Sequence, residues 1–149
     1  QNGMLDAFLA GNGLADATQV LRSEVDRLLN TPGSVELVRN FAGQWLQLRN
    51  LDRIAIDTER YPEWSTGLRE SMKRETYLLF EAVLREDRDV RELLDADFTF
   101  LDRRLAEHYG IPGVDGQDHQ RIALQDERRA GLLGHASVLT LTSNPAREF

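Results

Sequence analysis

Apolar side chains recur three or four positions apart along most of this chain, and that helical spacing constrains its fold more than any other feature. The spacing predicts helices over roughly residues 17–29, 33–48, 64–86 and 127–139, and a short helix that carries Val90, Leu93 and Leu94. A further helix is expected to start at a cap formed by Asp97 or Thr99 and to end at Gly110. Ile122 and Leu124 alternate with polar residues, which predicts a short strand over roughly residues 120–124. The sequence therefore predicts an all-α fold, an irregular bundle of about five helices with long connections and at most one short strand.

Glycine and proline mark where the predicted helices end. Gly110 is followed by isoleucine and proline. This is a strong stop signal, because glycine tolerates the left-handed conformation after a helix and proline cannot continue one. Two long connections, near residues 50–62 and 111–125, lie between helices. The first is expected to run extended across the core and to bury Ile54 and Ile56.

The predicted core combines the apolar faces of several helices. Each of its members stands on an apolar stripe at helical spacing, and the stripes are expected to meet in one cluster. With its ring buried there, Trp45→Ala would cost about 3–5 kcal/mol of stability. The predicted core residues are Phe41, Trp45, Leu68, Leu79, Phe80, Leu101, Leu105 and Leu132.

Composition narrows the class of protein. With 149 residues, 41% hydrophobic and 29% charged, the chain has the size and balance of one globular domain. Its net charge of −7 argues against duplex nucleic acid as a partner, since such binding relies on cationic contacts to phosphate. The absence of cysteine excludes disulfides, thiolate metal sites and covalent haem attachment in this segment. No apolar run approaches the ~20 residues that span a bilayer, so no membrane span is predicted.

The three histidines are the first candidates for chemistry, because histidine titrates near neutral pH. His108 is predicted in the last turn of a helix, where a cation complements the helix dipole. His119 is expected to be solvated in a loop. His135 stands between two small residues in the last predicted helix, where a packed and hydrogen-bonded side chain is expected. A catalytic role stays open as the alternative for His108 and His135.

Glu75 is the remaining candidate. It lies at the centre of the longest predicted helix, beside its apolar stripe. A buried carboxylate without a partner is expensive, so an inward-facing Glu75 must be paired. A structural ion pair is the main expectation, and a catalytic carboxylate is the alternative. The arginines that could pair with it are Arg49, Arg103, Arg104, Arg128 and Arg129.

No motif of established chemistry is complete in the sequence. The zinc-binding HExxH pattern and the di-iron ExxH pattern are both absent. The acidic stretch at residues 95–100 starts with the rhythm of a calcium loop and then lacks the required glycine. Neither a phosphate-binding loop nor a GxSxG serine motif occurs. The sequence therefore predicts no metal, no haem and no other cofactor in this segment, and its catalytic residues stay unknown.

Four strings of residues are distinctive enough to carry a family resemblance: Asn40–Leu48, Leu94–Leu101, Arg104–Val114 and Arg129–Pro145. They resemble a bacterial family of uncharacterised proteins, best known from planctomycetes, in which domains of unknown function accompany a cytochrome-c-like module. The resemblance covers nearly the whole chain. An Asn-Glu pair usually stands in the family where this chain has Asp102-Arg103, and a tyrosine stands in place of Phe98. Since no activity is established for the family, no catalytic residue is carried over from it.

The resemblance implies an exported, multidomain protein with a periplasmic or otherwise extracytoplasmic location and haem elsewhere in the chain. Residues 1–149 are expected to form one helical domain, a piece of a longer chain, and the resemblance implies a junction between two family domains near residues 115–125. The first function class is a structural or interaction module, whose partners are the other domains of the parent chain, including the haem module. The alternative is part of a secreted enzyme that acts on polysaccharide or another polymer.

The two ends of the sequence are the expected contact surfaces. Both are apolar and lie outside the best-patterned helices, and large apolar patches are uncommon on the surface of monomers. A neighbouring domain or a second copy of the chain is therefore expected to cover one of them. The residues concerned are Met4, Leu5, Phe8 and Leu9 at the start and Val138, Leu139, Leu141 and Phe149 at the finish.

Overall fold

A computed structural model describes residues 13–57, 59–125 and 127–143 of the chain. The chain divides into two compact units, Gln1–Leu37 and Val38–Phe149. The first unit holds α2 (Gly13–Leu29) and the beginning of α3 (Gly33–Trp45). On α2 the apolar residues stand at helical spacing as predicted, but Leu21 and Leu28 remain about half exposed, at 52% and 50%. The helix begins at Gly13, ahead of the predicted start.

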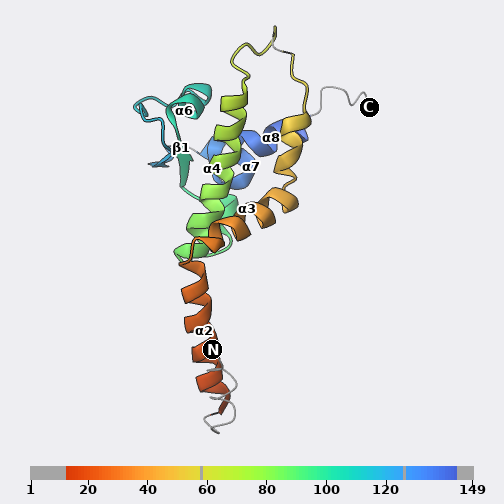
Figure 1. Cartoon of the computed structure of the whole chain (residues 1–149). Helices are drawn as coiled ribbons and strands as arrows, with labels where there is room; N and C mark the ends of the chain where they lie inside the picture. The colour runs from red at the N-terminus through yellow and green to blue at the C-terminus, as the bar shows by residue number, and fades with distance from the viewer. Residues whose placement is uncertain (1–12, 58, 126, 144–149) are drawn as a thin grey trace. The chain divides into compact units, whose positions relative to one another are not determined.

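The second unit is built around one long helix, α4 (Thr66–Arg85), drawn in green in Figure 1. The side chain of Ser65 caps its start by accepting a hydrogen bond from the Leu68 amide at 3.1 Å. Shorter elements pack against α4 on both sides, as Figure 1 shows. They are α5 (Glu92–Asp95), β1 (Phe98–Leu101), α6 (Arg103–Tyr109), α8 (Ala136–Thr142) and the 3-10 helix η1 (Leu48–Arg53). A further short helix, α7 (Gly131–Gly134), packs against α5 and α8.

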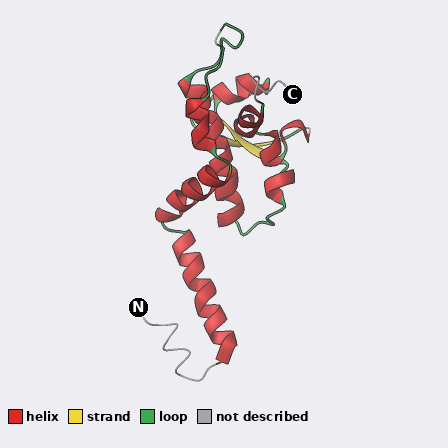
Figure 2. Cartoon of the chain, turned by 90° about the vertical axis from the view of Figure 1, so that its right-hand side faces the viewer, coloured by secondary structure: helices red, strands yellow, loops and turns green. Residues whose placement is uncertain are grey.

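The fold is mainly helical, as the sequence predicts. Across the described residues there are seven α-helices, two 3-10 helices and a single two-stranded sheet (Figure 2). The second 3-10 helix is η2 (Glu127–Arg129), and the second strand is β2 (Gln120–Ala123). The prediction of one domain with a junction near residues 115–125 stays a prediction.

The sheet contains one strand that the sequence prediction missed. β1 pairs antiparallel with β2, so that Phe98 lies opposite Ala123 and Leu101 opposite Gln120. Residues 97–110 were expected to form one helix, and this is wrong, because α6 begins only at Arg103. Residues Phe98–Leu101 are aromatic, β-branched or leucine, which suit a pleated strand once a partner strand is present. The predicted end of the helix at Gly110 is confirmed, with Gly110 in the left-handed region at φ 69°.

Two other helix boundaries also differ from the prediction. The helix predicted over residues 127–139 is divided into η2, α7 and α8. Gly131 has a φ of 56°, and the backbone of His135 is extended, so the helical hydrogen bonding stops at both positions. The second helix ends at Trp45, and Gln47 turns the chain with a left-handed φ of 54° into η1. The stretch expected to cross the core and bury Ile54 and Ile56 instead leaves both side chains half-buried.

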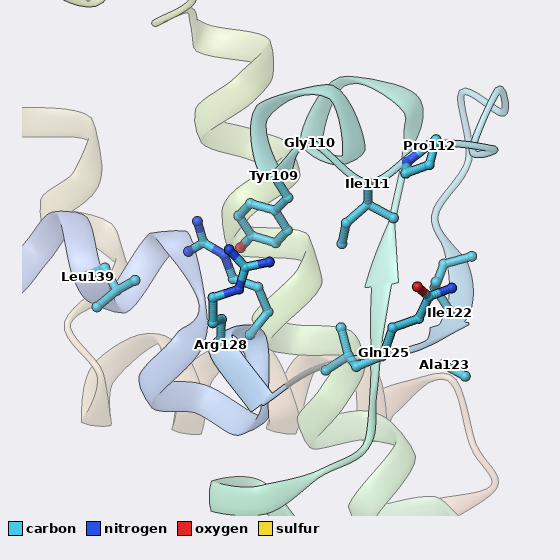
Figure 3. Close-up of a pocket in the computed structure, with 11 residues that line it drawn as sticks. Tyr109, Gly110, Ile111, Pro112, Ile122, Ala123, Gln125, Arg128 and Leu139 are labelled. Atoms are coloured by element: carbon cyan, nitrogen blue, oxygen red, sulfur yellow. The ribbon is translucent and has the colours of Figure 1, made fainter.

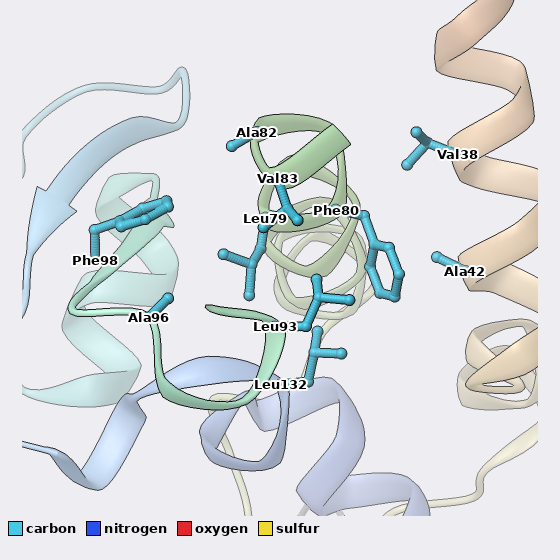
Figure 4. Close-up of a cluster of buried hydrophobic side chains, with 10 residues drawn as sticks. All are labelled: Val38, Ala42, Leu79, Phe80, Ala82, Val83, Leu93, Ala96, Phe98 and Leu132. Carbon is cyan, nitrogen blue, oxygen red and sulfur yellow. The ribbon is translucent and has the colours of Figure 1, made fainter. Parts of the chain in front are cut away.

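The core consists of two clusters rather than the one predicted. The first lies between α4, α5 and α7, and Figure 4 shows its ten buried side chains around Leu79. The second lies on the other part of α4 and includes Leu68, Met72, Leu101 and Leu105. The predicted core residues are therefore divided between the clusters. Leu79, Phe80 and Leu132 belong to the first, and Leu68, Leu101 and Leu105 belong to the second.

Two predicted core residues lie on the surface. Phe41 is 58% exposed and Trp45 is 57% exposed, so their assignment to the core is wrong. The inward face of α3 is narrow and is occupied by Val38 and Ala42, which are almost fully buried. Phe41 and Trp45 flank that face and pack edge-on against Phe80, with ring centroids 6.2 and 5.8 Å away.

Candidate functional site

A buried carboxyl group lies at the middle of α4. The Glu75 side chain has no exposed surface. Its two oxygens accept hydrogen bonds from hydroxyl groups of two other elements: Thr99 of β1 donates to Oε1 at 2.7 Å, and Tyr109 of α6 donates to Oε2 at 2.6 Å. Glu75 is therefore buried and paired, as expected, and its partners are these two hydroxyl groups. The expected ion pair with an arginine is wrong among the described residues.

Burial sets the protonation of this carboxyl group. Loss of water raises the pKa of Glu75 to about 7, although the hydrogen bonds from Tyr109 and Thr99 and the charge of Arg129 act in the opposite direction. Burial and the neighbouring carboxylate also raise the pKa of Tyr109, which keeps its hydroxyl protonated. That hydroxyl additionally accepts a hydrogen bond from the Ala136 amide at 2.8 Å. Tyr109 thus joins α4, α6 and α8 at one point.

His135 completes the buried network. Its Nδ1 lies 3.0 Å from Thr76 Oγ1, which lies 2.7 Å from Ser137 Oγ. Its Nε2 is 3.9 Å from Glu75 Oε1 and has no hydrogen-bond partner among the described residues. Burial, with a smaller contribution from the charge of Arg129, lowers the pKa of His135 to about 3. A neutral imidazole therefore lies beside the carboxyl group of Glu75.

The network has the residue types of a catalytic triad but not its accessibility. A hydroxyl, an imidazole and a carboxyl group can relay a proton when a substrate reaches the hydroxyl. Here Glu75, Thr76, Thr99, His135 and Ser137 all have no exposed surface. No substrate therefore reaches these side chains in this conformation, and the arrangement serves to fix the packing of the surrounding elements.

A cavity of about 540 Å³ lies beside Tyr109. Figure 3 shows Arg128 near Tyr109 on one side of this cavity, with Ile111 and Ile122 on the other. The guanidinium carbon of Arg129 lies 4.1 Å from the centre of the Tyr109 ring. The same guanidinium donates a hydrogen bond through Nη1 to the Gly134 carbonyl at 3.1 Å. The cavity thus has a fixed cation in its wall, and Tyr109 separates it from Glu75.

His108 and His119 lie apart from the buried network. His108 occupies the last turn of α6 as predicted, and its Nδ1 is 4.0 Å from Glu63 Oε1. It lines a separate cavity of about 580 Å³ with Trp64 and Leu68, and partial burial lowers its pKa. His119 was expected to be solvated, and this is wrong. It is half-buried, with Nε2 3.1 Å from the Ser71 carbonyl oxygen.

Of the three predicted site residues, the structure brings Glu75 and His135 together and leaves His108 elsewhere. The hydroxyl groups of Thr76, Thr99, Tyr109 and Ser137 were not predicted as partners. Their signal in the sequence is weak, because each stands within or beside an apolar stripe and looks like a core position. Asp102 was also missed. It caps α6, with Oδ1 accepting from the Leu105 amide at 2.8 Å, and its signal is an aspartate directly before a helix.

Within residues 13–57, 59–125 and 127–143, no three histidine, aspartate or glutamate side chains converge as metal ligands would. The predicted absence of metal and haem stays a prediction. In the same residues, no helix is both long and apolar enough to cross a membrane.

The fold and the site define a class of protein: a mainly helical domain whose central helix carries a sealed polar network. A family model described as PSD4, protein of unknown function (DUF1592), matches residues 6–111. Because this match covers more than half of the sequence, the chain belongs to that family. Neither curated proteins nor solved structures gave a match to the chain. The predicted resemblance is therefore confirmed at the level of a domain family of unknown function.

Proposed function

We propose that this domain is a structural and interaction module of a larger exported bacterial protein. Its partners in this proposal are other domains of the same parent protein, including a cytochrome-c-like module. The exported location and the haem module come from the resemblance of the sequence strings and belong to the proposal. The alternative, part of an enzyme acting on polysaccharide or another polymer, draws no support from Glu75 or His135, because neither reaches solvent.

One observation carries the proposal: an ordered aromatic surface formed by Phe41 and Trp45. Their rings are 5.9 Å apart and more than half exposed, and both pack against Phe80. Exposed aromatic side chains held in one arrangement bury a large area on docking and lose little entropy, which is why they are enriched at interfaces. A cavity of about 570 Å³ adjoins Trp45 and also contacts Ile54 and Leu141. The two aromatic rings and this cavity together form a surface suited to an apolar partner.

The test is binding between this chain and the other domains of its natural protein, each produced separately and measured by isothermal titration calorimetry. Trp45→Ser and Phe41→Ser should each weaken the binding at least about tenfold, as expected for central interface residues. Val90→Ser is the matched control, because Val90 is 69% exposed and belongs to neither the aromatic surface nor its cavity. Equal affinity of the three variants and the wild type would contradict the proposal, and so would an absence of binding by the wild type.

A further inference from the structure

The cavity beside Tyr109 plays no part in the proposed interaction module. It combines a guanidinium of defined orientation with a wall of aliphatic side chains. We infer that this cavity binds a small carboxylate with an apolar body, held by Arg129. The inference is independent of the proposed docking surface, since neither Phe41 nor Trp45 lines this cavity.

The orientation of Arg129 is set before any ligand arrives. The Tyr109 ring supports one face of the guanidinium at 4.1 Å, and the Gly134 carbonyl oxygen accepts from Nη1 at 3.1 Å. A guanidinium has five N–H donors, so these two contacts leave donors for a ligand. Its planar fork matches the two oxygens of a carboxylate, and a group that is already ordered loses little freedom on binding.

The charge of the cavity favours an anion. Of the described residues that line it, none is acidic, and Arg128 and Arg129 are both among them. Glu75, whose charge acts on Tyr109, is sealed from solvent and bonded to the Tyr109 hydroxyl. Glu75 therefore cannot fill the cavity in place of an external carboxylate.

The rest of the wall indicates the body of the ligand. Ile111, Pro112, Ile122 and Leu139 contribute aliphatic surface, and the volume of about 540 Å³ lies in the range of small-molecule sites. The Tyr109 ring face is taken by Arg129, so the ligand body meets aliphatic side chains rather than a stacking platform. An aromatic or alicyclic ring fits against this aliphatic part of the wall.

Phenylacetate is the probe, titrated into the full 149-residue chain and followed by two-dimensional ¹H–¹⁵N NMR. Binding on the order of millimolar is expected for a ligand of this size. The shifts should centre on residues 109–112 and 122–125. Phenylacetamide, which has the same shape without the charge, should bind at least about tenfold more weakly. Equal binding of the amide, or no shifts in these residues at ten times the expected dissociation constant, would overturn the inference.

Substitutions of the two arginines test which side chain binds the carboxylate. Arg129→Gln should weaken phenylacetate binding at least about tenfold, and Arg128→Gln should weaken it less. Arg103→Gln is the control, because Arg103 is exposed on α6 and paired with Glu107 outside the cavity. Because Arg129 also contacts Tyr109 and Gly134, circular dichroism checks the fold, and Arg128→Gln tests the site independently. Unchanged affinity in both variants would overturn the inference. Inorganic phosphate that binds as tightly as phenylacetate would also overturn it, since the apolar wall would then contribute nothing.

Discussion

Glu75 carries an ionisable group at a position with no exposed surface, so its protonation is linked to the stability of the fold. Its pKa of about 7 in the folded chain exceeds the ordinary value of 4.5. The folded state therefore holds the proton more tightly than the unfolded state. The stability that comes from this tighter proton binding is fully present below pH 4.5 and is lost as the pH rises through about 7. The difference corresponds to about 3 kcal/mol at most.

We predict that Glu75→Gln removes this dependence. The free energy of unfolding of the wild type, relative to the variant, should fall by about 3 kcal/mol between pH 4.5 and pH 8, measured by urea unfolding. His135 acts with the opposite sign, because its lowered pKa gives stability above pH 6.5 that is lost toward pH 3. It is present in both proteins, so the comparison isolates Glu75. A difference that stays constant with pH would contradict the prediction.

Because Trp45 is exposed, its replacement should cost far less stability than the replacement of a buried ring of the same size. With 57% of its surface exposed, Trp45→Ala should reduce the free energy of unfolding by about 1 kcal/mol or less. Leu79→Ala is the comparison within the first core cluster, where a fully buried leucine typically contributes about 2–5 kcal/mol. Urea unfolding of both variants measures the two losses. Equal losses would show that the Trp45 ring is packed much as a core residue is.

At the level of single residues, the sequence could predict the burial of Glu75, because the residue stands beside an apolar stripe. It could not predict the partners of Glu75. Thr99 and Tyr109 are 24 and 34 positions away in the chain and reach Glu75 only after β1 and α6 have packed against α4. The same holds for His135, whose neighbour Thr76 is 59 positions away. Local patterns carry no information about contacts of that range.

The junction between η2 and α7 depends on a glycine. Gly131 has a φ of 56°, and a Cβ placed there would lie 2.2 Å from the carbonyl oxygen of Leu94. We predict that Gly131→Ala costs more than about 3 kcal/mol, since the backbone contact cannot be relieved by rotating a side chain. Gly113→Ala is the control. Its φ of 84° carries a similar conformational penalty, but nothing lies within 4 Å of the added atom.

Thermal unfolding of the two variants separates the cost of the steric clash from the cost of the backbone conformation. Gly113→Ala should cost about 1 kcal/mol, from conformation alone. If Gly131→Ala were no more destabilising than Gly113→Ala, α7 would not be held tightly against α5.

At the level of elements, helical spacing predicted α2, α3 and α4 with errors confined to their ends. It failed for β1, because Phe98–Leu101 continues the apolar spacing of the following helix. The strand exists because β2, some twenty positions later, supplies the hydrogen-bond partners, and no local pattern contains that information. The break at His135 was missed for a similar reason, since its side chain is drawn into the network around Thr76.

Self-association is the prediction that belongs to the whole molecule. Residues 4–9 and Phe149 lie outside the described residues. Leu139 is 41% exposed, and Val138 and Leu141 are half-buried. We predict that the mass of the chain in light scattering rises with concentration, and that changing Leu5 and Phe8 to serine in one variant suppresses the rise. A strictly monomeric wild type across the concentration series would contradict the prediction.

The pairing of β1 with β2 has a practical consequence for anyone who expresses this family in pieces. The family match ends at residue 111, yet β2, α7 and α8 lie beyond it. Leu132 of α7, Ala136 of α8 and His135 between them belong to the packing around α4. We predict that a protein truncated after residue 111 exposes the open edge of β1 and aggregates, whereas the 149-residue chain gives a dispersed NMR spectrum. A soluble, well-dispersed truncated protein would contradict this. A cloning boundary taken from sequence similarity alone would cut through a hydrogen-bonded sheet.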